Sequence, residues 1–261
     1  MRIIDSHCHL DDDRFDFDRD QIVARAKANN IDHIVIPATT AQRWQKLKRV
    51  SELYEGVYPT YGLHPMFMAL HQAQHISELD VWLDREKPIA VGECGLDFFM
   101  GRIDEAQQIK IFSDQLQLAK NHHLPVIIHV RKAMDRTISL LRKFAPLTGV
   151  IHSFSGSQQQ ADQLIGLGFK LGIGATVGFE RAKKLRSVVA TVPSTALLIE
   201  SDAPDQPGAN HRGERNEPAF IIEQLTTIAL LRDVSENELA QALLRNTHDL
   251  FGFKGKLFGH A

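Results

Sequence analysis

The chain opens with a short apolar stretch that ends in two histidines. In MRIIDSHCHL, His7 and His9 stand two residues apart, and residues two apart on a β-strand point to the same side. The pair can therefore clamp one metal ion between two imidazoles, while Cys8 faces away. By itself a His-x-His pair also fits two ordinary polar residues that close a strand, so its role depends on partners elsewhere in the chain.

Other ionisable residues stand where further predicted strands end. Each follows a short apolar run: His64 in YGLHP, Glu93 in AVGE, His129 in VIIHVR, His152 in GVIH and Asp202 in LIESD. Imidazoles and carboxylates together suit Zn²⁺, Mn²⁺ or another borderline divalent ion, whereas an all-oxygen set would suggest Mg²⁺ or Ca²⁺. Apart from His64, these residues and the opening pair give six candidate ligands, four imidazoles and two carboxylates, which are too many for one tetrahedral ion with a position open to water. They suit two ions that share a carboxylate.

The elements that would position these residues alternate regularly. Apolar runs predict strands over 2–6, 33–38, 57–62, 88–93, 125–130, 149–153, 170–174 and 196–201. Helical periodicity predicts helices over 19–29, 41–54, 77–84, 104–121, 133–144, 157–167, 182–190, 219–231 and 236–251. Eight strand–helix units in a chain of this length predict an α/β fold, a (β/α)8 TIM barrel, as a single domain over residues 1–261. A doubly wound open sheet is the alternative, but no G-x-G-x-x-G follows the first strand.

A barrel places catalytic residues at the carboxyl ends of its strands. Because inward and outward positions alternate along a strand, the inward faces are expected to pair Ile127 with His129, Val150 with His152, Val91 with Glu93, and Leu198 and Glu200 with Asp202. Ionisable groups in a barrel interior are costly unless they are paired or metal-bound. Strand one would then supply one ion and strands five and six the other, with Glu93 between them.

Composition limits the classes of protein. With 261 residues, 43% hydrophobic and 24% charged, the chain can form a large core, and its net charge of -2 counts against extended tracking of a DNA duplex. Two cysteines do not indicate a disulfide framework. No apolar run approaches a membrane span and no signal peptide is evident. We expect a cytoplasmic protein, a monomer, with no membrane partner.

The succession DSHCHL, YGLHP, GECGLDFF, IHVRKA, IHSFSG, ESDAP, RGERNEP and NTHDLFGF, from residue 5 to about 252, resembles the TatD family of metal-dependent deoxyribonucleases, within the amidohydrolase-like superfamily. The resemblance implies that His7, His9 and Asp202 hold one divalent ion, that His129 and His152 hold the other, and that Glu93 bridges both. It makes His64 a catalytic neighbour rather than a ligand. The departures from the family pattern are Lys132, Ser201 and Cys94. None removes a ligand, but Lys132 leaves the substrate preference open.

The expected function is a binuclear phosphodiesterase, with Zn, Mn or Mg as the metal, that acts on DNA ends, single strands or a small phosphoester through a metal-activated water. Glu93 would hold the ions, Asp202 at the end of strand eight would be the general base, and a protonated His64 would assist the leaving oxygen. The alternative is a hydrolase of a small amide, ester or lactone with the same site. A non-catalytic metal protein is a third reading, against which the additional residue His64 argues.

Several other charged and aromatic residues have open roles. Arg131, Arg212 and Arg215 could contact phosphate, although Arg215-Asn216-Glu217 also reads as a helix start with Asn216 as N-cap. The acidic residues Asp11 to Asp13, Asp16, Asp18 and Asp20 are expected to be solvated loop and helix-start charges rather than a third metal site. Asp97 would orient the loop after Glu93. Phe98 and Phe99 could stack on bases or anchor that loop.

Overall fold

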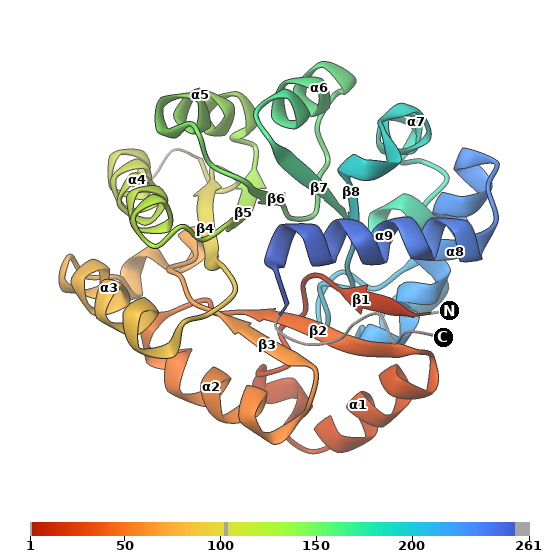
Figure 1. The fold of residues 1–261 in the computed structure, drawn as a ribbon, viewed down its shortest axis with the longest axis horizontal. Coiled ribbons are helices and arrows are strands. Elements are labelled where there is room, and N and C mark those ends of the chain that lie inside the picture. The colour runs from red at the N-terminus through yellow and green to blue at the C-terminus, as the bar shows by residue number, and fades with distance from the viewer. Residues whose placement is uncertain (1, 102–103, 254–261) are drawn as a thin grey trace.

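The computed structural model describes residues 2–101 and 104–253 and shows a ring of parallel strands surrounded by helices (Figure 1). In these residues the strands are β1 Ile3–Asp5, β2 Ile31–Pro37, β3 Val57–Thr60, β4 Val91–Asp97, β5 Val126–Arg131, β6 Gly149–Ile151, β7 Phe169–Ile173 and β8 Leu197–Ile199. The α-helices are α1 Arg19–Ala28, α2 Trp44–Leu53, α3 Gln74–Glu86, α4 Glu105–Asn121, α5 Met134–Phe144, α6 Gln158–Gly166, α7 Lys183–Thr191, α8 Ile221–Arg232 and α9 Glu236–Phe251.

The strands follow one another around the ring in chain order. Hydrogen bonds pair each strand with the next in two runs, β1-β2-β3 and β4-β5-β6-β7-β8. A parallel bridge between Tyr61 and Val91 links β3 to β4, and Ser6 N donates to Ile199 O at 3.0 Å, which links β1 to β8. At the β3–β4 junction a Cβ on Gly62 would come within 2.7 Å of the Gly92 backbone, so only glycine allows this approach. The predicted barrel is confirmed. That residues 1–261 form one domain stays a prediction, because some of them lie outside the described part.

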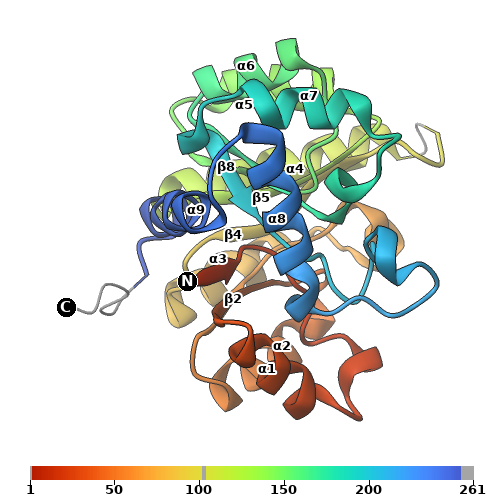
Figure 2. The same cartoon turned by 90° about the vertical axis from the view of Figure 1, so that its right-hand side faces the viewer.

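The inside of the barrel is filled near the amino ends of the strands. One buried cluster contains Ile4, Val35, Ala90, Ile127, Val150, Leu198, Phe251 and Phe253. The last two come from the end of α9 and the residues after it, and Figures 1 and 2 show α9 lying across one end of the barrel. Asn246 on α9 donates to Ser194 O at 2.7 Å and Leu197 O at 2.9 Å. This end is therefore closed, and the carboxyl ends of the strands remain for a site.

We predict a large loss of stability when this interior layer is opened. Leu198 is fully buried, and Leu198→Ala should lower the free energy of unfolding by about 2–5 kcal/mol, the usual cost of a Leu→Ala cavity. The measurement is urea unfolding followed by circular dichroism. Leu230→Ala is the control: this leucine on α8 is 78% exposed, and its replacement should change stability by less than about 0.5 kcal/mol. Equal losses in the two variants would contradict the assignment of the interior.

One prediction of side-chain direction is wrong. Val91 belongs to the outer core between strands and helices, whereas Ala90 lies in the interior cluster. The pairing of β4 with β5 shifts register between Val91 and Cys94, so simple alternation fails there and Glu93 still faces the barrel interior. Among the described helices, none has both the length and the apolar character that crossing a bilayer requires.

Candidate metal centre

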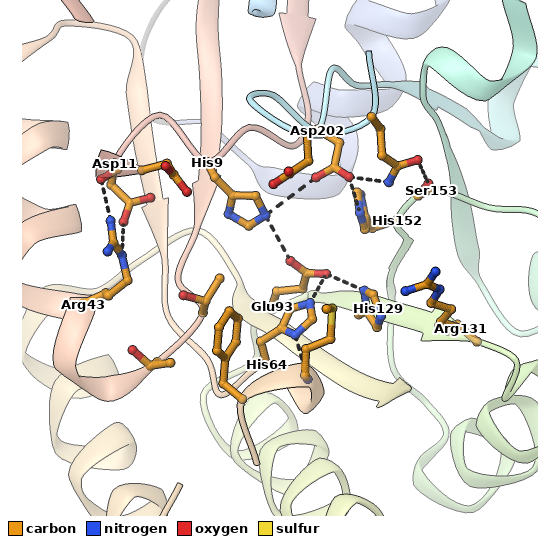
Figure 3. A pocket seen from close by; sticks show the side chains of 18 of the residues that line it. His9, Asp11, Arg43, His64, Glu93, His129, Arg131, His152, Ser153 and Asp202 are labelled. Carbon is orange, nitrogen blue, oxygen red and sulfur yellow. Dashed lines mark hydrogen bonds and ion pairs between the residues drawn. The ribbon is translucent and has the colours of Figure 1, made fainter. Parts of the chain in front are cut away.

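The predicted ligands converge at the open end of the barrel, and Figure 3 shows all of them except His7, together with His64. Three groups each bring one ligand atom per residue within 4.8 Å of the others: His7 with His9 and Asp202, His7 with Glu93 and His152, and His64 with Glu93 and His129. His7, His9, His152 and Asp202 come from segments that follow short strands, while Glu93 and His129 lie within β4 and β5. The barrel therefore brings together residues up to 195 positions apart.

The first ion-sized position lies between the ends of β1, β4 and β8. His7 Nε2 lies 3.4 Å from His9 Nε2, 3.1 Å from Glu93 Oε2 and 3.7 Å from Asp202 Oδ1. His9 Nε2 lies 3.6 Å from both carboxylate oxygens. Ligands at 2.0–2.2 Å around a tetrahedral ion are about 3.3–3.6 Å apart. These four side chains therefore fit a divalent ion.

The hydrogen bonds around this position also favour a cation. His9 Nδ1 lies 3.3 Å from Pro37 O, which fixes its proton on Nδ1 and leaves a lone pair on Nε2. Glu93 Oε2 is buried without a hydrogen-bond partner. A buried oxygen and an imidazole lone pair that face the same point need a positive charge there.

The second group is arranged differently from the prediction. Glu93 Oε1 lies 3.1 Å from His129 Nδ1 and 3.1 Å from His64 Nε2. His152 instead stacks on His7, with ring centroids 3.5 Å apart, and its Nε2 lies 3.5 Å from Asp202 Oδ2. The structure thus groups His129 with His64 rather than with His152. The two oxygens of Glu93 face different histidines, as a bridging carboxylate requires.

Two further carboxylates orient the histidines from behind. Asp97 Oδ2 lies 2.9 Å from His129 Nε2, so Nδ1 of that ring is turned toward Glu93. Glu200 Oε1 lies 2.8 Å from His152 Nδ1 and accepts from Ser153 N at 2.5 Å. A carboxylate hydrogen-bonded to the far ring nitrogen fixes the tautomer of a metal-binding histidine, as Asp97 does for His129. Glu200 forms a charge contact with His152, whose Nδ1 has no hydrogen-bond partner. The role of Glu200 was not predicted, although it shares the inward face of strand eight with Asp202.

We expect Asp97→Asn to weaken metal binding by about 10–100-fold, because loss of such an outer partner usually costs that much. An asparagine can present its NH₂ group to His129 Nε2 and so reverse the tautomer. The measurement is a competition titration of the metal-free protein with a chelating dye. Asp114→Asn is the control, since Asp114 is on the outside of α4 and pairs with Lys110. Unchanged metal affinity in Asp97→Asn would contradict this role.

Helix α4 positions two segments of the site through buried glutamines. Gln115 Oε1 accepts from Leu63 N at 2.7 Å and its Nε2 donates to Leu63 O at 3.1 Å, directly before His64. Gln108 holds the Asp97 peptide in the same way, at 2.9 and 3.0 Å. The two glutamines are seven residues apart on the buried face of α4. A polar residue repeated every two turns on an apolar face is the sequence signal that could have revealed them.

Asp5 joins the first and last strands beneath the site. Its carboxylate accepts from Ser201 N at 2.9 Å, Ser201 Oγ at 2.5 Å and His7 N at 3.2 Å. Burial raises the pKa of Asp5 to about 7. The Ser201 hydroxyl donates to Asp5, so this departure from the family pattern keeps a hydroxyl donor at the position. Cys8 and Cys94 are buried free thiols, and Cys8 faces the outer core as predicted.

The charges of the cluster balance one another. Burial alone would raise the pKa of Glu93 and of Asp202, but the neighbouring histidines hold both well below their usual range. Burial likewise opposes protonation of His152, yet Glu200 and Asp202 raise its pKa well above the ordinary value. Divalent ions bound by these groups must displace such protons, so we expect metal uptake to release protons.

The predicted acid role of His64 does not fit its surroundings. Burial lowers the pKa of His64 to about 4, and its Nδ1 accepts from Met66 N at 3.0 Å. The proton of the neutral ring is then on Nε2, which faces Glu93 rather than a leaving group. His64 is placed to orient Glu93.

Of the three arginines that could contact phosphate, Arg131 lines the cavity above the cluster, whereas Arg212 and Arg215 do not. Arg215 donates to Asp18 at 2.9 Å and to Arg14 O at 2.6 Å, and Arg212 lies 5.0 Å from the Phe179 ring. The charge of Arg215 is therefore already paired with Asp18, which counts against a phosphate contact at this position.

Asn216 is not a helix N-cap. Its Nδ2 donates to Ser201 O and Asp205 O, both at 2.8 Å, and so connects the long loop after β8 to the site.

The acidic residues near the amino end are ion-paired rather than simply solvated. Asp11 is buried and lies 3.1 Å from Arg43, and Asp13 lies 2.5 Å from Lys46.

The cluster lies at the base of an open cavity of about 960 Å³. One wall is apolar and includes Met66, Phe67 and Leu70, which are all partly exposed. Another wall carries Arg131, which makes none of the marked contacts in Figure 3. The cavity can thus hold a ligand that combines an anionic group with flat apolar rings.

Known proteins match this chain over nearly its full length. The family model described as TatD-related DNase matches residues 4–252. An uncharacterized metal-dependent hydrolase, YjjV of Escherichia coli, is 39% identical over 253 residues, which are 96% of this chain and 98% of that protein. A protein of Pantoea named 3'-5' ssDNA/RNA exonuclease TatD is 33% identical over 257 residues, covering 95% and 99%.

A solved structure has the same fold. The crystal structure of YjjV, a TatD homologue from Escherichia coli, superposes with a TM-score of 0.93 at 37% identity and covers 97% of this chain and 98% of that one. This chain belongs to the TatD-related DNase family of metal-dependent hydrolases.

Proposed function

We propose that this protein is a phosphodiesterase that shortens single-stranded DNA or RNA from an end, with two divalent ions per chain. The observation that carries the proposal is the ligand cluster, in which Glu93 directs one oxygen toward His7 and His9 and the other toward His64 and His129. The relative named as an exonuclease on single strands supports the substrate class. Zn, Mn and Mg are the candidate metals.

The charge of the site suits a phosphodiester. When two divalent ions occupy the cluster, they lower the pKa of a water molecule and offset negative charge on the phosphate oxygens. Four positive charges against the carboxylates of Glu93 and Asp202 leave a net positive site by formal count. Arg131 adds a guanidinium at the cavity wall, which suits a non-reacting phosphate oxygen.

We assign the general base to Asp202. Its pKa lies well below the usual range, so it is ionised at neutral pH and can accept a proton from the attacking water. Gln206 Nε2 donates to Asp202 Oδ2 and holds the carboxylate in place. Glu93 would hold the ions through its two oxygens, and His64 acts by orienting Glu93. That the protein works as a cytoplasmic monomer stays a prediction from the sequence.

The test uses the full-length protein after treatment with a chelator. Added Mn²⁺, Mg²⁺ or Zn²⁺ should restore stepwise shortening of an end-labelled single-stranded oligonucleotide, and labels at the 5' and 3' ends separately will show the direction. Hydrolysis of small esters, amides or lactones without cleavage of the oligonucleotide would favour the alternative hydrolase. If the protein holds its full complement of metal but cleaves neither the oligonucleotide nor the small esters, amides and lactones, it is a metal-binding protein without this hydrolase activity.

A further inference from the structure

A second cavity, of about 440 Å³, adjoins the first beside β5 and β6. Val130 and Ser155 line both cavities. Val130 follows His129, and Ser155 lies three residues after His152, so the shared wall is attached to two members of the cluster. A nucleic acid strand that extends from the metal centre on this side would enter the second cavity directly.

Three cations mark this route. Arg131 lines the first cavity, while Lys132 and Arg136 line the second. The Phe99 ring connects the first two: its centroid lies 3.5 Å from Arg131 Cζ and 4.8 Å from Lys132 Nζ. Cations interleaved with an aromatic ring are typical of surfaces that follow a single-stranded backbone.

These cations differ from the others around the cavity mouth. Arg14 is held by Asp12 and Asp205, and Arg43 by Asp11 and Asp13.

In the described part of the chain, Arg131, Lys132 and Arg136 make no ion pair. Among the described residues, Asp135 is the carboxylate that lines the second cavity; it accepts from Gln160 Nε2 at 2.7 Å and offsets one of the two positive charges of Lys132 and Arg136. With Arg131, Lys132 and Arg136 against Asp135, the β5 side of the site carries a net positive charge.

We propose that the second cavity binds the phosphate next to the scissile one. The protein would then prefer strands with at least two phosphodiester linkages over a single phosphodiester. This inference rests on the proposed function for the identity of its ligand. Lys132, the departure that left substrate preference open, acquires a role as a binding residue for the adjacent linkage, with Arg136 beside it.

The test measures binding without turnover. Calorimetry with metal-free protein in excess chelator compares thymidine dinucleotide, which has one linkage, with the trinucleotide, which has two. Wild-type protein should bind the trinucleotide about tenfold more tightly, the size of one charge-assisted hydrogen bond. The double variant Lys132→Gln with Arg136→Gln should bind both alike, with its dinucleotide affinity unchanged.

Two controls separate charge from other effects. Lys143→Gln removes one charge from the far end of α5 and should keep the wild-type preference. A trinucleotide whose second linkage is an uncharged methylphosphonate should bind wild-type protein like the dinucleotide. The proposal is overturned if wild-type protein shows no preference for the trinucleotide, or if the double variant keeps it. Dinucleotide cleavage by the metal-loaded protein tests the proposed function separately.

Discussion

Glu93→Gln is expected to lower kcat/KM on a single-stranded oligonucleotide by more than about 100-fold. Loss of a hydrogen-bond partner behind a metal ligand costs up to about 100-fold, and Glu93 is itself a proposed ligand. The two oxygens of Glu93 face His7 and His9 on one side and His64 and His129 on the other. A glutamine offers one oxygen and one NH₂ group, so it cannot present an acceptor to both sides. The protein should also retain less metal after dialysis.

Metal analysis and thermal unfolding distinguish this loss from misfolding. The variant should remain folded, because removal of a buried carboxylate also removes its desolvation cost. Glu238→Gln, an exposed position on α9, is the matched control and should keep full metal content and activity. A Glu93→Gln protein with wild-type metal content and turnover would refute the bridging assignment.

Asp202→Asn is expected to lower kcat by about 10²–10⁴-fold, the usual contribution of a general base, with little change in KM. An amide oxygen can still face His7 and His9 as Asp202 Oδ1 does, so metal content should fall less than in Glu93→Gln. The measurement is single-turnover cleavage of a labelled oligonucleotide by protein of known metal content.

Asp205→Asn controls for a lost carboxylate in the same loop. Asp205 also lines the cavity but pairs with Arg14, and its replacement should leave kcat within a few-fold of wild type. If Asp202→Asn and wild-type preparations cleave at the same rate, Asp202 is not the base and a contaminating nuclease becomes the simplest explanation.

The alternation of residues along single strands predicted where most of the candidate ligands lie, because strand direction and side-chain alternation are local properties of the sequence. The apolar residues Ile127, Val150 and Leu198 lie in the barrel interior, as the parity of their strands predicted. His129, His152 and Asp202 follow them at the open end. The same reasoning failed at Val91, where the register of β4 shifts, since a shift depends on the neighbouring strand.

Roles that depend on distant partners were not predictable in this way. Arg215 is an available cation by sequence, but Asp18, almost two hundred residues away, neutralises it. By residue type His64 could be a catalytic acid, but burial lowers its pKa and Met66 N donates to its Nδ1, so it is a neutral ring beside Glu93. Such pairings arise from loops that meet only in the folded barrel.

The sequence by itself predicted the barrel, six candidate ligands and the side of each strand on which most of them lie, because residue type and two-residue periodicity are local properties. Only the tertiary structure decided which histidines share an oxygen of Glu93, which carboxylates orient them and which cations stay unpaired. The reason is distance: hydrogen bonds and ion pairs act over about 3–4 Å, and contacts on that scale between residues far apart in the chain exist only after the strands have closed into a ring.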